Sequence, residues 1–184
     1  MKLIVGLGNP GKEYEKTRHN AGFIAIDILE SILPQASGWT LQRNFHAEIA
    51  EGHTHNEKII LAKPNTYMNL SGEAVKELAS YYKIPTEHIL ILHDELDIPP
   101  GKITFMAKGS PAGHKGIQSI QELLGTQAIQ RLRIGIGRPE PPHTTENWVL
   151  GRIDELTKEV CTHAADAALD WISKGIDAAM NDWN

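Results

Sequence analysis

The first strand and the turn that follows it, residues 2–11, read KLIVGLGNPG and decide the fold. The apolar, β-branched start predicts a strand over Lys2–Gly6. Three glycines follow in the pattern G-x-G-x-x-G and permit a tight turn. Open α/β sheets place their functional sites at the carboxyl edge of the strands. We therefore expect the turn to present Asn9 at that edge.

The same glycine pattern is the fingerprint of a dinucleotide-binding turn, but its context argues against that function. A Rossmann loop begins its helix within the glycines, so that backbone N–H groups face a pyrophosphate. Pro10 supplies no N–H and disfavours helical geometry at Asn9. The next apolar helix begins only near His19 or Asn20. These features disfavour a nicotinamide oxidoreductase. It is kept as an alternative, which quenching of tryptophan emission by NADH would support.

Apolar runs alternate with amphipathic segments along the rest of the chain. Strands are predicted at Lys2–Gly6, His46–Ala50, Lys58–Ala62, His88–Leu92, Lys102–Met106 and Leu132–Ile136. Helices are predicted at Asn20–Leu33, Ser71–Tyr82 with Ser71 as cap, Lys115–Leu124 with Gly125 as C-cap, and Asp154–Ala179. The segment His46–Ala62 resembles a hairpin, which makes the sheet mixed. We expect one α/β domain over residues 1–184, a twisted mixed β-sheet flanked by helices.

Composition narrows the class of protein. Hydrophobic residues make up 41% and charged residues 22% of the 184 residues, which is typical of a globular domain. The single cysteine, Cys161, fits a reducing compartment. No signal peptide or membrane span is predicted, so we expect a cytoplasmic protein without a membrane partner. The net charge of -5 disfavours general affinity for nucleic acid but leaves room for a local basic surface.

Two polar segments follow predicted strands and could supply a catalytic pair. His19 lies in TRHN, where it is either a partly buried capping residue or a functional imidazole. Asp94 lies in HDELD, where it either belongs to a solvated turn or orients a histidine. Both segments follow strands at the same sheet edge, so the two side chains could meet. No second cluster of ligands accompanies them, so we expect no metal.

Two further segments combine polar side chains with helix starts. Residues 63–72, KPNTYMNLSG, place two amides beside Tyr67 and form either helix caps or a pocket wall. Residues 108–116, KGSPAGHKG, bring two lysines and His114 to a helix N-terminus, which suits anions. The alternative is an ordinary surface loop.

Five stretches in this order resemble bacterial-type peptidyl-tRNA hydrolases. They are GLGNPGKEYEKTRHNAGF, KPNTYMNLSG, HDELDIPPG, GHKG and RLRIGIG, and they are distributed along residues 2–151. The resemblance implies a compact α/β domain that acts on tRNA whose 3′ end still carries a peptide. We expect the protein to be a monomer and to need no cofactor. The sequence holds no nucleophile elbow, and Cys161 has the apolar spacing of a packing residue, so we expect direct attack by water on the ester with no covalent intermediate.

The resemblance assigns roles to residues that match the family motifs. It implies that His19 is the base, that Asp94 supports it, and that Asn9 lies beside the scissile bond. It implies further substrate contacts from Tyr14, Tyr67, Asn69 and His114. Lys115 stands where the family usually has asparagine. An amide that donates and accepts hydrogen bonds is thus replaced by an ammonium group that only donates them.

The tRNA itself needs phosphate contacts rather than base readout. We expect Lys108, Lys115 and Arg133 to provide them, and a salt-independent affinity would count against this patch. The Lys115 replacement also keeps a second hypothesis open, namely an RNA-binding relative that has lost turnover.

Overall fold

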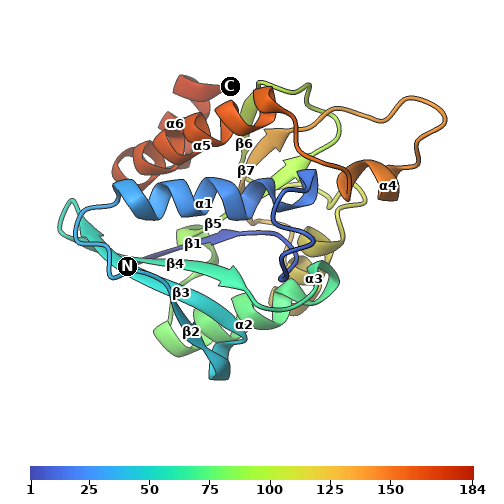
Figure 1. Cartoon of the computed structure of the whole chain (residues 1–184). Coiled ribbons are helices and arrows are strands. Elements are labelled where there is room, and N and C mark those ends of the chain that lie inside the picture. Colours follow the sequence, from blue (N-terminus) through green and yellow to red (C-terminus); the bar gives the residue numbers. More distant parts are fainter.

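A seven-stranded mixed sheet forms the centre of the computed structural model, which describes all 184 residues (Figure 1). The strands are β1 (Lys2–Gly6), β2 (Thr40–Gln42), β3 (Ala47–Thr54), β4 (Glu57–Pro64), β5 (Ile89–Glu95), β6 (Ile103–Met106) and β7 (Gln130–Gly135). Their order is β2-β3-β4-β1-β5-β7-β6. The four strands β4, β1, β5 and β7 are parallel, and β2, β3 and β6 pair antiparallel. The predicted fold class is confirmed.

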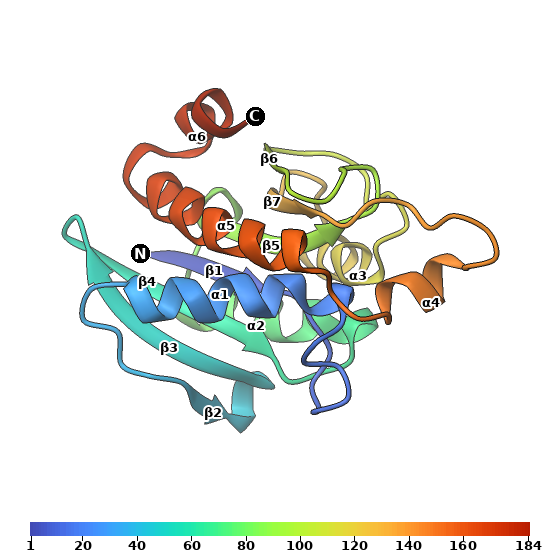
Figure 2. The same ribbon diagram turned by 45° about the horizontal axis from the view of Figure 1, so that its top comes forward.

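Helices cover both faces of this sheet. They are α1 (Ala21–Ile32), α2 (Ser71–Tyr82), α3 (Lys115–Leu124), α4 (Thr145–Val149), α5 (Glu155–Lys174) and α6 (Ile176–Trp183). Short 3-10 helices are η1 (Arg18–Asn20), η2 (Arg43–Phe45), η3 (Met68–Leu70) and η4 (Thr86–His88). Helices α1 and α5 pack side by side on one face, and α2 and α3 on the other (Figures 1 and 2). No helix combines the length and the apolar character that crossing a membrane would require.

The central strand β1 shows why its sequence is apolar throughout. Ile4 packs into the core beneath α1 and α5, whereas Leu3 and Val5 pack into the core beneath α2 and α3. All three are fully buried. A parallel strand covered on both faces needs a continuous apolar run rather than an alternating one.

Most predicted elements occur where the sequence places them. β1, α2 and α3 have the predicted bounds, and Gly125 ends α3 with a left-handed φ of 70°. The β3–β4 hairpin is also confirmed. His55 and Asn56 form its tip with positive φ values of 51° and 57°, which match the right-handed twist of a two-residue hairpin turn.

Two local predictions are wrong, and two short elements were not predicted. Ser71 does not cap α2 but is its first residue, and its hydroxyl donates to the Met68 carbonyl instead. The predicted helix Asp154–Ala179 is two helices, because Gly175 adopts a positive φ of 81° and breaks the run. The short elements β2 and α4 were missed, since three and five residues carry too little periodic pattern.

One close backbone approach positions the site. A Cβ built at Gly22, in the first turn of α1, would lie 2.3 Å from the Leu92 carbonyl oxygen in β5. Only glycine lets the start of α1 press against β5 at this point. The residues just before α1 are therefore held beside the last residues of β5.

Candidate active site

A cleft of about 1000 Å³ opens at the carboxyl edge of the parallel strands. Four segments form most of its lining: the end of β5, the loop after β4, the loop before α3, and α4. Residues that line the cleft include Asn9, His19, Tyr67, Asn69, Asp94, His114, Lys115, Thr145, Glu146, Val149 and Leu150. This is the edge at which the sequence predicted the site.

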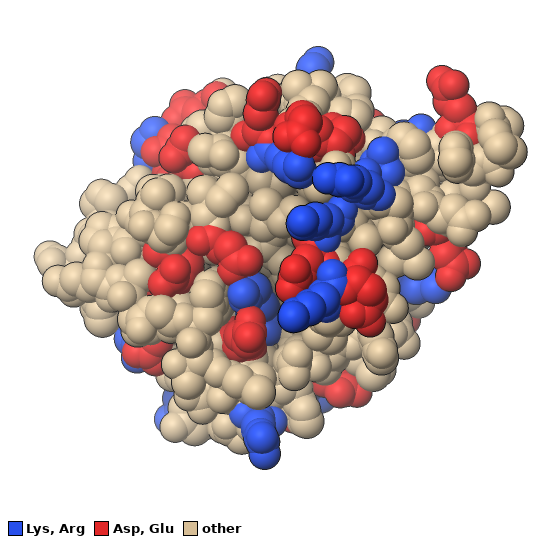
Figure 3. Space-filling view, in the orientation of Figure 1, with Lys and Arg blue, Asp and Glu red and all other residues tan.

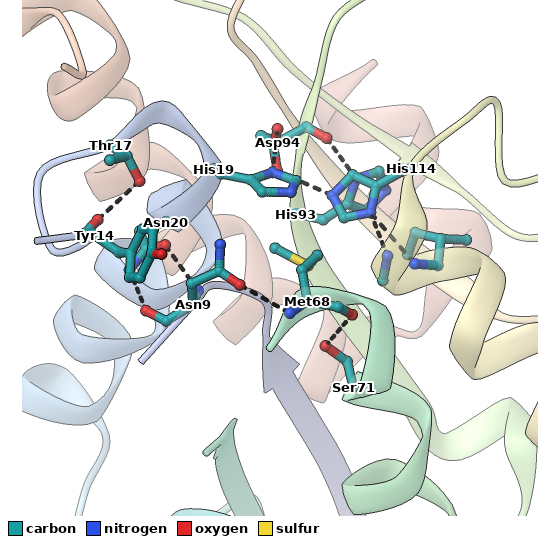
Figure 4. Close-up of polar contacts among 12 residues, drawn as sticks. Asn9, Tyr14, Thr17, His19, Asn20, Met68, Ser71, His93, Asp94 and His114 are labelled. Atoms are coloured by element: carbon teal, nitrogen blue, oxygen red, sulfur yellow. Dashed lines mark hydrogen bonds and ion pairs between the residues drawn. The ribbon is translucent and has the colours of Figure 1, made fainter. Parts of the chain in front are cut away.

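His19 and Asp94 form a direct pair inside this cleft (Figure 4). The His19 Nδ1 atom lies 2.9 Å from Asp94 Oδ1 and 3.0 Å from Oδ2. Asp94 is the second-last residue of β5 and is only 2% exposed, whereas His19 belongs to η1 and reaches the cleft. An ionised carboxylate only accepts hydrogen bonds, so His19 donates from Nδ1. The lone pair of the neutral ring is then on Nε2.

His114 makes a second hydrogen bond to the same carboxylate, and its other contacts fix the tautomer of its neutral ring. Its Nδ1 accepts from the backbone N–H groups of Gly116 (3.2 Å) and Ile117 (3.3 Å), which makes His114 the cap of α3. The proton of the neutral ring is therefore on Nε2, 3.0 Å from Asp94 Oδ1. Asp94 thus receives one hydrogen bond from each of two histidines.

Burial and charge move the pKa values of this cluster in different directions. Burial raises the pKa of Asp94, but the two histidines lower it by a larger amount. The net pKa lies far below the usual range of a carboxyl group, so Asp94 stays ionised. Burial and the nearby Lys115 charge lower the pKa of His19. The charge and the hydrogen bond of Asp94 raise that pKa by more. The net pKa of His19 is above its ordinary value of 6.5.

His93 is a supporting residue that sequence reasoning did not identify. Its Nδ1 donates to the Asp94 carbonyl oxygen at 2.6 Å, and its ring packs edge-on to His114 with centroids 4.7 Å apart. Burial lowers the pKa of His93 well below 6.5, so the ring stays neutral. The only sequence signal was its place in the apolar strand directly before Asp94.

Asn9 is held with its amide nitrogen free. Its Oδ1 accepts from the Met68 backbone N–H at 2.8 Å, and its own backbone pairs with the Asn20 side chain at 2.9 and 3.0 Å. The Nδ2 group is therefore the part of Asn9 that faces the cleft (Figure 4). Asn20 is a second residue that the sequence analysis left without a role.

The remaining predicted contacts are only partly brought together. Tyr67, Asn69, His114 and Lys115 all line the cleft, with Lys115 as the exposed first residue of α3. Tyr14 does not line it. Neither does Lys108, which is exposed in the loop before α3, nor Arg133, whose Nη1 lies 3.8 Å from the Glu95 carboxylate.

The surface charges are mixed rather than concentrated. Figure 3 shows lysine and arginine side chains interspersed with acidic ones on the face that carries α1. This matches the overall charge of -5. Phosphate binding on this face would depend on individual cations rather than on a large basic field.

The cluster of His19, Asp94 and His114 also has the composition of a metal site, because its ligand atoms lie within 4.8 Å of one another. The short Nδ1···Oδ1 and Nε2···Oδ1 distances of 2.9 and 3.0 Å are those of hydrogen bonds. A cation would have to replace both. The arrangement as it stands fixes the tautomer of His19 and stabilises positive charge on it.

Comparison with known proteins gives a consistent result. The family model described as peptidyl-tRNA hydrolase matches residues 3–184. The peptidyl-tRNA hydrolase of Bacillus cytotoxicus is 46% identical over 191 residues, and that of an Exiguobacterium species is 47% identical over 189 residues; each alignment covers 100% of both chains. The crystal structure of the Acinetobacter baumannii peptidyl-tRNA hydrolase is 37% identical, with a TM-score of 0.90 over 98% of this chain and 93% of that one.

Proposed function

The chain belongs to the peptidyl-tRNA hydrolase family, and we propose that His19 and Asp94 activate water in its reaction. The reaction is hydrolysis of the ester between the peptide carboxyl group and a ribose hydroxyl at the 3′ end of tRNA. It returns free tRNA and free peptide from stalled or dropped-off translation. The observation that carries the mechanism is the His19–Asp94 pair, with Nδ1 held and Nε2 left without a partner in the cleft.

The first step is attack by water on the ester carbonyl. His19 Nε2 takes a proton from the water molecule as its oxygen bonds to the carbonyl carbon, because neutral water is a poor nucleophile. The buried Asp94 carboxylate stabilises the imidazolium that forms. The Nδ2 group of Asn9 donates to the developing oxyanion, and a donor of this kind typically contributes about 10²–10³-fold in rate.

The second step is collapse of the tetrahedral intermediate. The bond to the ribose oxygen breaks, and the His19 Nε2–H donates its proton to that oxygen. The products are the peptide acid and the tRNA 3′-terminal hydroxyl, and His19 is neutral again. No cofactor is required by this scheme.

A covalent route through the chain's cysteine has no support. Cys161 is buried in α5, and burial raises the pKa of its thiol to about 12. Its Sγ donates to the Ala21 carbonyl at 3.6 Å. A thiol of this kind is a packing group, not a nucleophile.

Substrate contacts follow from the residues around the pair. We propose that Tyr67, Asn69, His114 and Lys115 bind the peptide and the terminal nucleotide. A side-chain amide can both donate to and accept from a neutral peptide group. The ammonium of an aminoacyl-tRNA can only donate, so it cannot make the same pair of hydrogen bonds. Tyr14, Lys108 and Arg133 lie outside the cleft lining, so they would act on the tRNA beyond its terminal nucleotide.

We further propose that residues 1–184 act as one domain and as a monomer, without an obligate protein partner. The substrate would place the protein where translation occurs, in the cytoplasm. The test of the function is a comparison of two substrates. The protein is expected to release peptide from an N-acetylated aminoacyl-tRNA and to spare the same tRNA with a free α-amine. Binding of both without release of either would instead support a relative that has lost turnover.

Lys115→Asn is expected to move the pH profile of hydrolysis. The Lys115 charge lowers the pKa of His19, so its removal raises that pKa. Because the base must be neutral, the acidic limb of kcat/KM is expected to shift to higher pH, with less change above it. Lys76→Asn is the matched control, since Lys76 is exposed on α2 and does not line the cleft. An unchanged acidic limb in Lys115→Asn would contradict electrostatic coupling to the base.

A further inference from the structure

The catalytic segment and α4 are joined by a contact that the reaction scheme does not use. We propose that Arg18 and Trp148 form a latch that positions the α4 wall of the cleft relative to His19. The role of this wall in substrate binding rests on the proposed function. The latch itself is a statement about the packing of α4 and can be measured without turnover.

The geometry of the latch involves three kinds of contact. The Arg18 guanidinium carbon lies 3.7 Å from the centroid of the Trp148 ring, in the range of a strong cation–π contact. Arg18 Nη1 also donates to the Trp148 carbonyl at 3.3 Å, and the Arg18 backbone N–H donates to Gly151 O at 3.0 Å. Arg18 directly precedes His19 in η1, so the same short turn carries the base and the latch.

Trp148 is fixed from its other side as well. Its Nε1–H donates to the Gly137 carbonyl at 2.8 Å and to the Ile136 carbonyl at 3.2 Å. Ile136 in turn donates its N–H to Glu95 O at 3.0 Å, one residue after Asp94. Trp148 therefore connects the segment that follows β7, and through it the end of β5, to the residue before His19.

The wall depends on this connection because α4 has little stability of its own. It contains five residues, far fewer than an isolated helix needs. Residues 140–144, which lead into it, and its own first three residues are all exposed. Yet α4 and the residue after it supply Thr145, Glu146, Val149 and Leu150 to the cleft. Without the Trp148 ring, the backbone bonds to Gly151 and Arg152 would remain, but α4 itself would lose the contact that holds its side chains at a fixed distance from His19.

His19 has an independent anchor, which separates the two effects. Asp94 holds the imidazole directly at 2.9 Å, whatever the position of α4. Loss of the latch is therefore expected to weaken substrate binding and to leave the chemical step largely intact. A role confined to global stability would lower the melting temperature without selective loss of binding.

Arg18→Lys and Trp148→Leu test the latch. The first keeps the charge and loses the planar group that stacks on the indole, and the second removes the ring. The first readout is amide hydrogen exchange in residues 145–150. The second is the Kd for a CCA trinucleotide that carries an N-acetyl amino acid through a 3′-amide, which cannot be hydrolysed as an ester. The third is kcat on peptidyl-tRNA.

Each variant is expected to accelerate exchange in residues 145–150 about tenfold, without a change in α5. The Kd is expected to rise about five- to tenfold, because a partly desolvated cation–π contact stabilises the arrangement by a corresponding free energy. The double variant is expected to be no worse than Trp148→Leu alone, and kcat is expected to fall less than twofold. Arg152→Lys is the matched control, because Arg152 pairs with Thr17 through its backbone and its side chain is exposed.

Two results would overturn the latch. Unchanged exchange would show that Arg18 and Trp148 do not hold α4, and faster exchange with an unchanged Kd would show that the wall does not serve binding. Failure of the wild-type protein to hydrolyse peptidyl-tRNA would remove the proposed function, but exchange and Kd would still decide the latch.

Discussion

His19→Ala is expected to lower kcat on peptidyl-tRNA by about 10²–10⁴-fold, the usual contribution of a general base. The imidazole is the group in the cleft with a free ring nitrogen and a buried carboxylate behind it. Water attack in the variant would proceed without proton removal, while Asn9 would still stabilise the oxyanion. Because the base acts in the transition state, kcat should fall while KM changes little. Single-turnover release of labelled peptide measures this directly.

His163→Ala is the control, because His163 is exposed on α5 and does not line the cleft. Added imidazole is expected to restore part of the rate in His19→Ala and to have no effect on the control. Retention of more than a tenth of the wild-type kcat in His19→Ala, with a normal circular dichroism spectrum, would exclude His19 as the base.

Asp94→Asn is expected to reduce kcat by a similar factor of about 10²–10⁴, through the tautomer rather than through loss of the base. The amide can donate from Nδ2 to His19 Nδ1, which leaves the proton on Nε2 and no lone pair toward the water. The pKa of His19 should also fall, because the Asp94 charge and hydrogen bond raise it in the native protein. The acidic limb of the remaining activity is therefore expected to move to lower pH, opposite to the shift in Lys115→Asn.

Histidine proton chemical shifts, followed by NMR over a pH titration, report this pKa without requiring turnover. Asp27→Asn is the matched control, because Asp27 forms an exposed ion pair with Lys63 at 2.7 Å and lies outside the cleft. If Asp94→Asn kept near-native kcat, or if the pKa of His19 rose, the proposed support of the base by Asp94 would be wrong.

The proximity of His19 and Asp94 could be expected from the sequence for a physical reason. Strands and helices leave periodic patterns in the chain, and parallel strands place their carboxyl ends at one edge. Asn9, His19 and Asp94 all follow predicted strands, so the pattern indicated that they could meet at this edge. The order of the five motifs then indicated the family.

Other predictions failed where a local pattern was weak or misleading. Gly175 sits on the apolar stripe of the predicted C-terminal helix, yet its backbone conformation ends α5 there. The helix α4 has too few residues to show a period. Neither composition nor periodicity carries information on such turns.

The sequence by itself determined the α/β class, the edge at which the site lies, and the family. Only the tertiary structure decided which atoms meet: the sharing of Asp94 between His19 and His114, the free Nδ2 of Asn9, and the attachment of α4 through Trp148. The reason is that these contacts join residues far apart in the chain, 75 positions for His19 and Asp94. Their distances depend on packing, such as the approach of Gly22 to β5, which no local pattern encodes.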